Sequence, residues 1–186
     1  MVKTQVKRPN IVLIMVDDMG YSDLGCCGGE IKTPNIDRLA EMGVTFTRAY
    51  TPYPVCKSFR KSMMTGLMPS KVSDLTSHPS IGRTLRDSGY ETVYHGKWHV
   101  ANTNIEDDAE WHGFETYDRS QMDTGTRGRL LNFLQQKHDK PFFLVASFMN
   151  PHDACELARN IGGIEDNYKD QPVEEHWTRH RENRMG

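Results

Sequence analysis

The sequence is constrained most by a continuous apolar run, Ile11 to Val16, that ends at two adjacent carboxylates, Asp17 and Asp18. The run has the length of a strand and does not alternate between apolar and polar residues, which is typical of a strand buried on both faces. A second run, Phe142 to Phe148, has the same character and also ends in a polar loop. Since such strands occur mainly in parallel sheets covered by helices, the two runs predict an α/β fold.

Helical and extended patterns alternate between these two runs. Thr33 and Pro34 suit the cap and first turn of a helix that Gly43 would end. We predict further helices at 59–65, 81–87 and 128–137, and further strands at 44–50 and 92–95. This alternation favours a mostly parallel sheet with helices on both faces.

The chain of 186 residues is long enough for one globular domain with a sizeable core. We expect this α/β domain to occupy residues 1–155. The remaining segment, 156–186, is charged and poor in aliphatic residues. We therefore expect it to be a peripheral polar tail, with one helix at 173–184.

Charge and composition exclude several functions. The net charge of −2 and the isoelectric point near 6.4 give no basic surface, so nucleic acid is not an expected partner. The longest apolar run is too short to cross a membrane, and we predict no signal peptide, which leaves the compartment open. The four cysteines, Cys26, Cys27, Cys56 and Cys155, have neither the number nor the spacing of a disulfide framework or a zinc site.

Polar residues follow three of the predicted strands at their carboxyl ends. They are Asp17 and Asp18, Lys97 and His99, and a group that includes His152. Ligands of open α/β sheets bind at this edge, so we expect the three groups to converge on one site.

The residue types allow both chemical and structural roles. Asp17 and Asp18 offer hard oxygen ligands for Ca²⁺ or Mg²⁺, although an Asx turn or a helix cap is the alternative. Lys97 and His99 would face the same way in an extended segment, where they could bind an anion and move a proton, or they are solvated loop residues. His152 is either a donor to an anionic oxygen or an ordinary loop histidine.

Cys56 precedes the helix predicted at 59–65. At a helix N-terminus, free N–H groups and the helix dipole lower a thiol pKa or hold an anion. The alternative is a small buried hydrophobic residue, which is the commoner use of cysteine. Arg60 lies one helical turn later, on the same side as Cys56.

Five blocks of sequence together resemble a known family. They are NIVLIMVDDMGYSDLGCCG, TPNIDRLAEMGVTFTRAY, PVCKSFRKSMMTGLMP, LRDSGYETVYHGKWHV and KPFFLVASFMNPHD. Their order and spacing resemble the N-terminal part of type I sulfatases, which belong to the alkaline phosphatase superfamily. The resemblance runs from about residue 9 to about residue 153 and implies a truncated sulfatase-like α/β fold.

The resemblance implies a role for each candidate residue. A maturation enzyme would convert the cysteine to formylglycine, whose gem-diol is the nucleophile, and the aspartates would hold a divalent cation, usually Ca²⁺. The implied substrate is a sulfated carbohydrate or another sulfate ester, and family members are often periplasmic, secreted or lysosomal. The implied catalytic residues are Cys56, Arg60 and His99, the implied sulfate-binding residues are Lys97 and His152, and the implied metal ligands are Asp17 and Asp18.

The sequence departs from the family in two respects. Ser58 and Phe59 replace the proline and serine of the Cys-x-Pro-Ser-Arg signature, and sulfatases are usually more than twice as long. These departures favour an inactive truncated homologue that serves as a binding module. A phosphonate or phosphate ester hydrolase of the same superfamily is a further alternative, because related sites handle both kinds of tetrahedral anion. A truncated sheet would expose a strand edge and apolar surface, from which we expect association or poor solubility.

Overall fold

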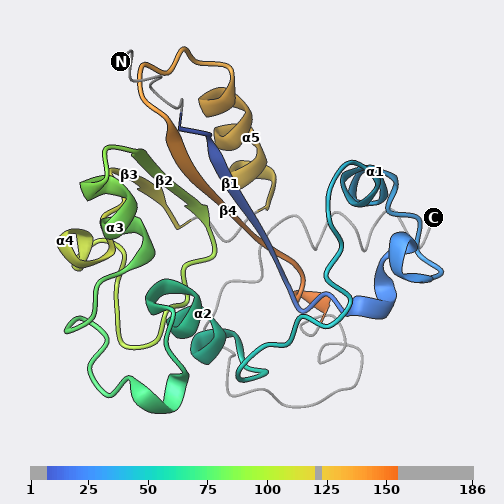
Figure 1. The fold of residues 1–186 in the computed structure, drawn as a ribbon, viewed down its shortest axis with the longest axis horizontal. Coiled ribbons are helices and arrows are strands. Elements are labelled where there is room, and N and C mark those ends of the chain that lie inside the picture. The colour runs from blue at the N-terminus through green and yellow to red at the C-terminus, as the bar shows by residue number, and fades with distance from the viewer. Residues whose placement is uncertain (1–7, 120–122, 155–186) are drawn as a thin grey trace, which may run out of the picture. The chain divides into compact units, whose positions relative to one another are not determined.

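A parallel sheet organises the chain in a computed structural model that describes residues 8–119 and 123–154 (Figure 1). Every pair of neighbouring strands is parallel, and the strand order is β1-β4-β2-β3. The strands are β1 (Ile11–Asp17), β2 (Glu91–Gly96), β3 (Thr116–Asp118) and β4 (Phe142–Pro151). The two apolar runs therefore pair with each other, as neighbouring strands of an α/β fold.

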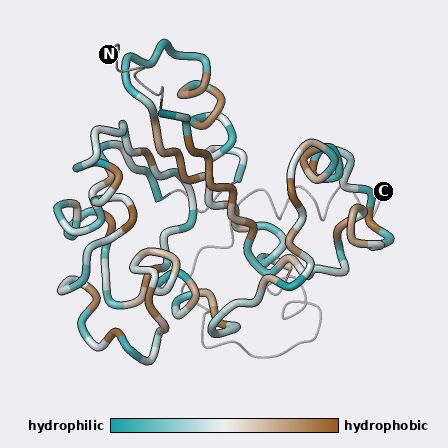
Figure 2. Tube along the Cα trace, in the orientation of Figure 1, coloured by the Kyte–Doolittle hydropathy of each residue, from teal (hydrophilic) through white to brown (hydrophobic). Residues whose placement is uncertain are grey.

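Helices cover both faces of the sheet, as the sequence predicts. In β4, Phe143 and Val145 join one core cluster, whereas Phe142, Leu144 and Ala146 join the other. The first cluster includes residues from α2 (Cys56–Thr65), α3 (Ile81–Asp87) and α4 (Ala109–His112), and the second includes residues from α5 (Asp123–Leu134). Figure 2 shows the apolar residues concentrated along the central strands.

Most predicted elements form, with shifted ends. Helix α3 has the predicted bounds. Helix α2 begins at Cys56 rather than at residue 59, and α5 begins five residues earlier than predicted. Helix α1 (Pro34–Met42) follows Thr33, but the Thr33 hydroxyl does not cap it. That hydroxyl instead donates to Asp37 Oδ1 at 2.7 Å and accepts from the Gly25 amide at 2.9 Å. Sequence patterns missed α4 and β3, which are only 4 and 3 residues long.

The strand predicted at 44–50 is wrong. Its alternating apolar residues, Val44, Phe46 and Tyr50, are 79%, 76% and 87% exposed, and the segment is irregular. A strand needs a neighbouring backbone to satisfy its N–H and C=O groups, and the described part of the chain supplies none beside this segment. The alternation of apolar and polar residues was therefore not enough to predict a strand at 44–50.

The edge strand β1 is covered on one face only. Ile11, Leu13 and Met15 pack against the first core cluster, whereas Val12 and Ile14 on the opposite face are 47% and 54% exposed. The expectation that the sheet edge promotes association stays a prediction.

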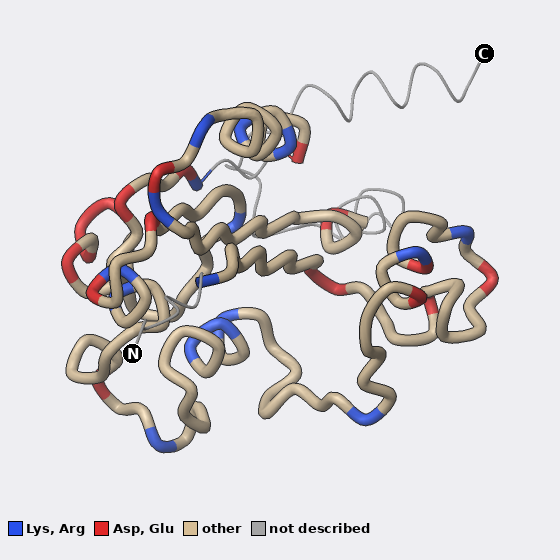
Figure 3. Tube along the Cα trace, turned by 45° about the horizontal axis from the view of Figure 1, so that its top comes forward, with Lys and Arg blue, Asp and Glu red and all other residues tan. Residues whose placement is uncertain are grey.

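Acidic and basic residues are interspersed along the described chain (Figure 3). None of the described helices has the length and apolar character needed to cross a membrane.

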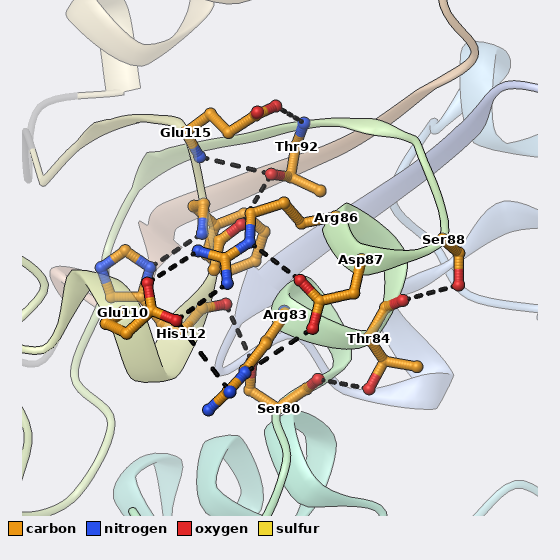
Figure 4. A network of polar contacts seen from close by, with 12 residues as sticks. Ser80, Arg83, Thr84, Arg86, Asp87, Ser88, Thr92, Glu110, His112 and Glu115 are labelled. Atoms are coloured by element: carbon orange, nitrogen blue, oxygen red, sulfur yellow. Dashed lines mark hydrogen bonds and ion pairs between the residues drawn. The ribbon is translucent and has the colours of Figure 1, made fainter.

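Polar contacts join α3 to α4 near Thr92, at the start of β2 (Figure 4). Ser80 caps α3 by accepting a hydrogen bond from the Arg83 amide at 3.0 Å, and its hydroxyl donates to the carbonyl of His112 at 2.8 Å. Arg86 and Glu110 form a bidentate ion pair at 3.1 and 3.3 Å. These contacts fix α4 against α3 beside the sheet.

The chain divides into two compact units, residues 1–152 and residues 153–186. The predicted tail and its helix at 173–184 lie outside the described residues.

Candidate functional site

Asp17, the last residue of β1, pairs with two cations that come from different parts of the chain. Its Oδ2 atom lies 2.6 Å from Lys97 Nζ and 3.3 Å from Arg60 Nη2. The side chains are nearly buried, with exposed fractions of 11% for Asp17, 5% for Lys97 and 4% for Arg60. The fold thus brings together three of the predicted site residues, from the end of β1, the loop after β2 and helix α2.

Arg60 fixes the loop that carries Lys97. Its Nη1 group donates to the carbonyls of Lys97 at 2.6 Å and Trp98 at 3.3 Å, and it also contacts Tyr94 Oη at 3.1 Å and Ser147 Oγ at 2.9 Å. The Tyr94 and Ser147 hydroxyls donate to the same Lys97 carbonyl, at 2.5 and 2.7 Å. One backbone carbonyl therefore receives three hydrogen bonds, which holds Lys97 in place.

The backbone at the end of β2 requires glycine. Gly96 has a φ of +102°, and a Cβ atom built on it would lie 1.9 Å from the carbonyl oxygen of Ser147. A larger residue would break the approach of this loop to β4. Gly96 therefore lets the chain turn so that Lys97 reaches Asp17.

The pKa of Asp17 is lowered by its cationic neighbours. Burial raises the pKa of this carboxyl, but the hydrogen bond and charge of Lys97, together with the charges of Arg60 and His152, outweigh burial. The site therefore keeps a carboxylate ionised in a largely buried setting. The charge of His152 acts on Asp17, which places His152 in the same electrostatic environment.

Cys56 begins α2 and contacts His99. Its Sγ atom lies 3.4 Å from His99 Nδ1, and the thiol is half-buried. Burial lowers the pKa of His99, and the positive charges of Lys97, Lys57 and Arg60 lower it further, so a neutral imidazole is favoured. A neutral imidazole next to the helix N-terminus can accept a proton from a group at position 56.

His152 follows β4 directly and is tied to β1 through the backbone. Its amide donates to the carbonyl of Asp17 at 3.2 Å and to that of Met149 at 3.0 Å. Asp18 has a left-handed backbone, with a φ of +64°. The three groups predicted to converge thus meet at the carboxyl ends of β1, β2 and β4, beside the N-terminus of α2.

The predicted cation ligands do not make a complete site. Within residues 8–119 and 123–154, no three His, Cys, Asp or Glu side chains are grouped so that they could hold a metal ion. Oδ2 of Asp17 is also engaged by Lys97 and Arg60. The oxygen donors of Asp17 and Asp18 have the right chemistry for Ca²⁺, but this cation takes about six to eight oxygen ligands. Asp17 and Asp18 therefore supply only part of the oxygen ligands that a divalent cation needs.

Sequence reasoning missed three residues that shape the site. Tyr94 and Ser147 lie inside predicted strands, where a hydroxyl group carries no signal of its own, and both bond to Lys97. Asp123 begins α5 and bonds to the end of β4. The roles of Tyr94, Ser147 and Asp123 become visible only when the folded chain brings segments that are distant in sequence into contact.

Comparisons with known proteins agree with this architecture. A sequence model of the sulfatase family matches residues 9–180. The uncharacterized sulfatase YidJ of Escherichia coli K12 is 29% identical over 194 residues, which cover 79% of this chain and 39% of that protein. Human steryl-sulfatase is 39% identical over 113 residues, which cover 50% of this chain and 19% of that protein.

Solved structures share the fold. The structure of BT4656 in complex with its substrate, D-glucosamine-2-N,6-O-disulfate, aligns with a TM-score of 0.65 and 24% identity, over 78% of this chain and 35% of that one. A protein of the alkaline phosphatase superfamily from Vibrio parahaemolyticus aligns with a TM-score of 0.62 and 20% identity, over 90% of this chain and 45% of that one.

The chain therefore shares the fold of a solved protein of the alkaline phosphatase superfamily. By its sequence, the chain belongs to the sulfatase family. The matched region spans 39% and 19% of the length of the two curated relatives described above.

Proposed function

We propose that this chain contributes the nucleophile and sulfate-binding half of a sulfate ester hydrolase. The observation that carries the proposal is the convergence of Cys56, His99, Lys97 and Asp17 at one edge of the sheet in a member of the sulfatase family. A sulfate ester is a tetrahedral anion, and this edge offers a buried ammonium group and a helix N-terminus to such an anion.

The chain's own residues have distinct proposed roles. Lys97 and His152 stabilise negative charge on the sulfuryl oxygens, which grows in the transition state. His99 accepts or returns a proton at position 56, since its neutral imidazole lies 3.4 Å from Sγ. Arg60 supports the nucleophile residue and orients Lys97. Conversion of Cys56 to formylglycine would supply a hydrated aldehyde, which is the nucleophile implied by the family.

Asp17 and Asp18 are the proposed protein ligands for Ca²⁺ or Mg²⁺. Carboxylate oxygens are the donors that these hard cations take, and further oxygen ligands must complete the shell. Asp17 would have to share its carboxylate between the cation and Lys97. Lys97 Nζ lies only 2.6 Å from Asp17 Oδ2, so the charge of Lys97 would oppose a cation bound to the same carboxylate.

The proposed substrate is a sulfated carbohydrate or the sulfate ester of another alcohol. Support comes from BT4656, a structural neighbour solved with a disulfated glucosamine as its substrate, and from a relative named steryl-sulfatase. A phosphonate or phosphate ester is the alternative substrate, because a lysine and a helix N-terminus also bind those anions. If Cys56 is never converted to the nucleophile, the chain would instead be an anion-binding module without turnover. Ser58 and Phe59, which depart from the family signature, support this alternative.

Mass spectrometry and hydrolysis assays test the proposal together. The chain is produced with a maturation enzyme, and the peptide containing Cys56 should lose about 18 Da, the mass change from thiol to aldehyde. The matured protein should then release sulfate from an aryl sulfate, and release no phosphate from the matching phosphate ester. Cys56→Ala should abolish both the mass change and the release, whereas Cys26→Ala should leave both unchanged. Conversion without sulfate release would contradict hydrolysis by this chain.

A further inference from the structure

We infer that Asp123 is a positioning residue, which aims His152 at the site by holding an irregularity at the end of β4. The first observation is a change of register between β1 and β4. Val16 pairs with Phe148, but the next residue, Asp17, pairs with Pro151. Met149 and Asn150 therefore have no opposite residues in β1, as in a β-bulge. Bulges bend a strand and redirect the side chains that follow it.

The backbone N–H groups released by this bulge are bound by one side chain. Asp123 Oδ1 accepts from the Met149 amide at 2.7 Å, and Oδ2 accepts from the Asn150 amide at 2.9 Å and from Asn150 Nδ2 at 2.7 Å. A carboxylate suits three donors because it only accepts hydrogen bonds. An amide at position 123 would turn an NH₂ group toward one of these N–H groups.

The bulge ends where His152 begins. The His152 amide bonds to the carbonyl of Asp17 at 3.2 Å and to that of Met149 at 3.0 Å, which closes the bulge against β1. The charge of His152 acts on the Asp17 carboxyl. A continuous series of contacts thus leads from Asp123 through Met149 and His152 to Asp17.

The consequence for binding rests on the proposed function. Asp123 lies at the first turn of α5 and contacts the bulge rather than the sulfate-binding groups. It therefore acts on a bound sulfate only through His152. Loss of one charge-assisted hydrogen bond to an anion weakens binding by about tenfold or more.

The first experiment follows the unliganded protein by NMR and does not depend on sulfate binding. Asp123→Asn should move the amide signals of Met149, Asn150 and His152. Asp139→Asn, which removes a carboxylate that is 91% exposed, should change none of them. Unchanged signals at residues 149–152 in D123N would overturn the inference. Amide exchange in the wild-type chain gives an independent check, because rapid exchange at Met149 and Asn150 would also overturn it.

The second experiment measures the affinity for inorganic sulfate in a double-mutant cycle. Asp123→Asn should weaken sulfate binding by about tenfold in the wild-type background. It should have almost no effect when His152→Ala is already present, because the two residues act as one unit. Equal losses in both backgrounds would show a general structural role and overturn the positioning role. A wild-type chain that does not bind sulfate would contradict the proposed function, while the NMR result would still decide the role of Asp123.

Discussion

The Lys97 ammonium group lies 2.6 Å from the Asp17 carboxylate, and both side chains are almost buried. Arg60 adds a second cation to this carboxylate at 3.3 Å. The pair links the end of β1 to the loop after β2, although β4 lies between these strands. It is both the electrostatic centre of the candidate site and a connection across the sheet.

Lys97→Met should destabilise the folded chain. Removing one partner of a buried ion pair leaves the other charge poorly compensated, and we expect a loss of about 3 kcal/mol in the free energy of unfolding. Urea unfolding followed by circular dichroism measures this loss. Lys137→Met is the matched control, because Lys137 and its partner Asp139 are 92% and 91% exposed. A loss in K97M as small as that in K137M would show that the buried pair contributes little.

Acid should destabilise the wild-type chain partly through Asp17. The pKa of this carboxyl is lowered in the folded state, so its contribution is fully present above the unfolded value of 3.8 and is lost as the pH falls through the folded value. Stability profiles between pH 6 and pH 2 should therefore fall less steeply below 3.8 in Asp17→Asn than in the wild type. Parallel profiles would contradict a lowered pKa.

His138 should produce the opposite dependence on pH. Its two ring nitrogens lie 2.9 Å from Glu91 Oε2 and 2.9 Å from the carbonyl of Phe133, and two acceptors favour a doubly protonated ring. Burial lowers the pKa of His138, but these two hydrogen bonds and the charge of Glu91 outweigh it, so the pKa is raised. The contribution is fully present below the unfolded value of 6.5 and is lost as the pH rises through the folded value.

The measurement for His138 is thermal unfolding between pH 5 and pH 9. The melting temperature of the wild type should fall relative to that of His138→Gln as the pH rises through neutrality. Glu91→Gln should remove most of this difference, since Glu91 is the charged partner in the described structure. A constant difference between wild type and H138Q across this range would contradict the protonated ring.

Arg60→Lys should be far from conservative. The Nη1 group alone contacts four oxygen atoms of the loop and the sheet, and a lysine cannot reproduce the planar arrangement of a guanidinium group. We expect a loss of about 2 kcal/mol in the free energy of unfolding. Arg83→Lys, at a side chain that is 45% exposed, should cost less than about 0.5 kcal/mol. Equal losses in the two variants would argue against a special role for Arg60.

Lys97 should weaken the binding of Ca²⁺. The cation and the ammonium group would compete for the same carboxylate, since Lys97 Nζ already lies 2.6 Å from Asp17 Oδ2, and two cations beside one carboxylate repel each other. Calcium titrations should therefore show a larger rise in melting temperature for Lys97→Met than for the wild type, and the rise should disappear in the double variant with Asp18→Asn. A smaller rise in K97M than in the wild type would show that Lys97 does not compete with Ca²⁺.

Patterns along the sequence predicted the elements that depend on local chemistry. Helix α3 has the predicted bounds because Ser80 and Gly89 flank it. The apolar run of β4 is buried on both faces as predicted, whereas β1, for which the same burial was predicted, is an edge strand covered on one face only. The convergence of Asp17, Lys97 and His152 followed from the general rule that polar residues meet at the carboxyl edge of a parallel sheet. The strand at 44–50 failed because pairing depends on a neighbour that alternation does not reveal.

The sequence by itself determined the fold class through its apolar runs, which are local features of the chain. The family and the roles of the candidate site residues came from the resemblance of five sequence blocks to type I sulfatases. Only the tertiary structure decided which of these side chains contact each other. Lys97 bonds to Asp17, His99 contacts Cys56, and Asp123 holds the bulge before His152. These contacts join residues between 26 and 80 positions apart. Their strength depends on burial and distance, and both arise only when the strands pair.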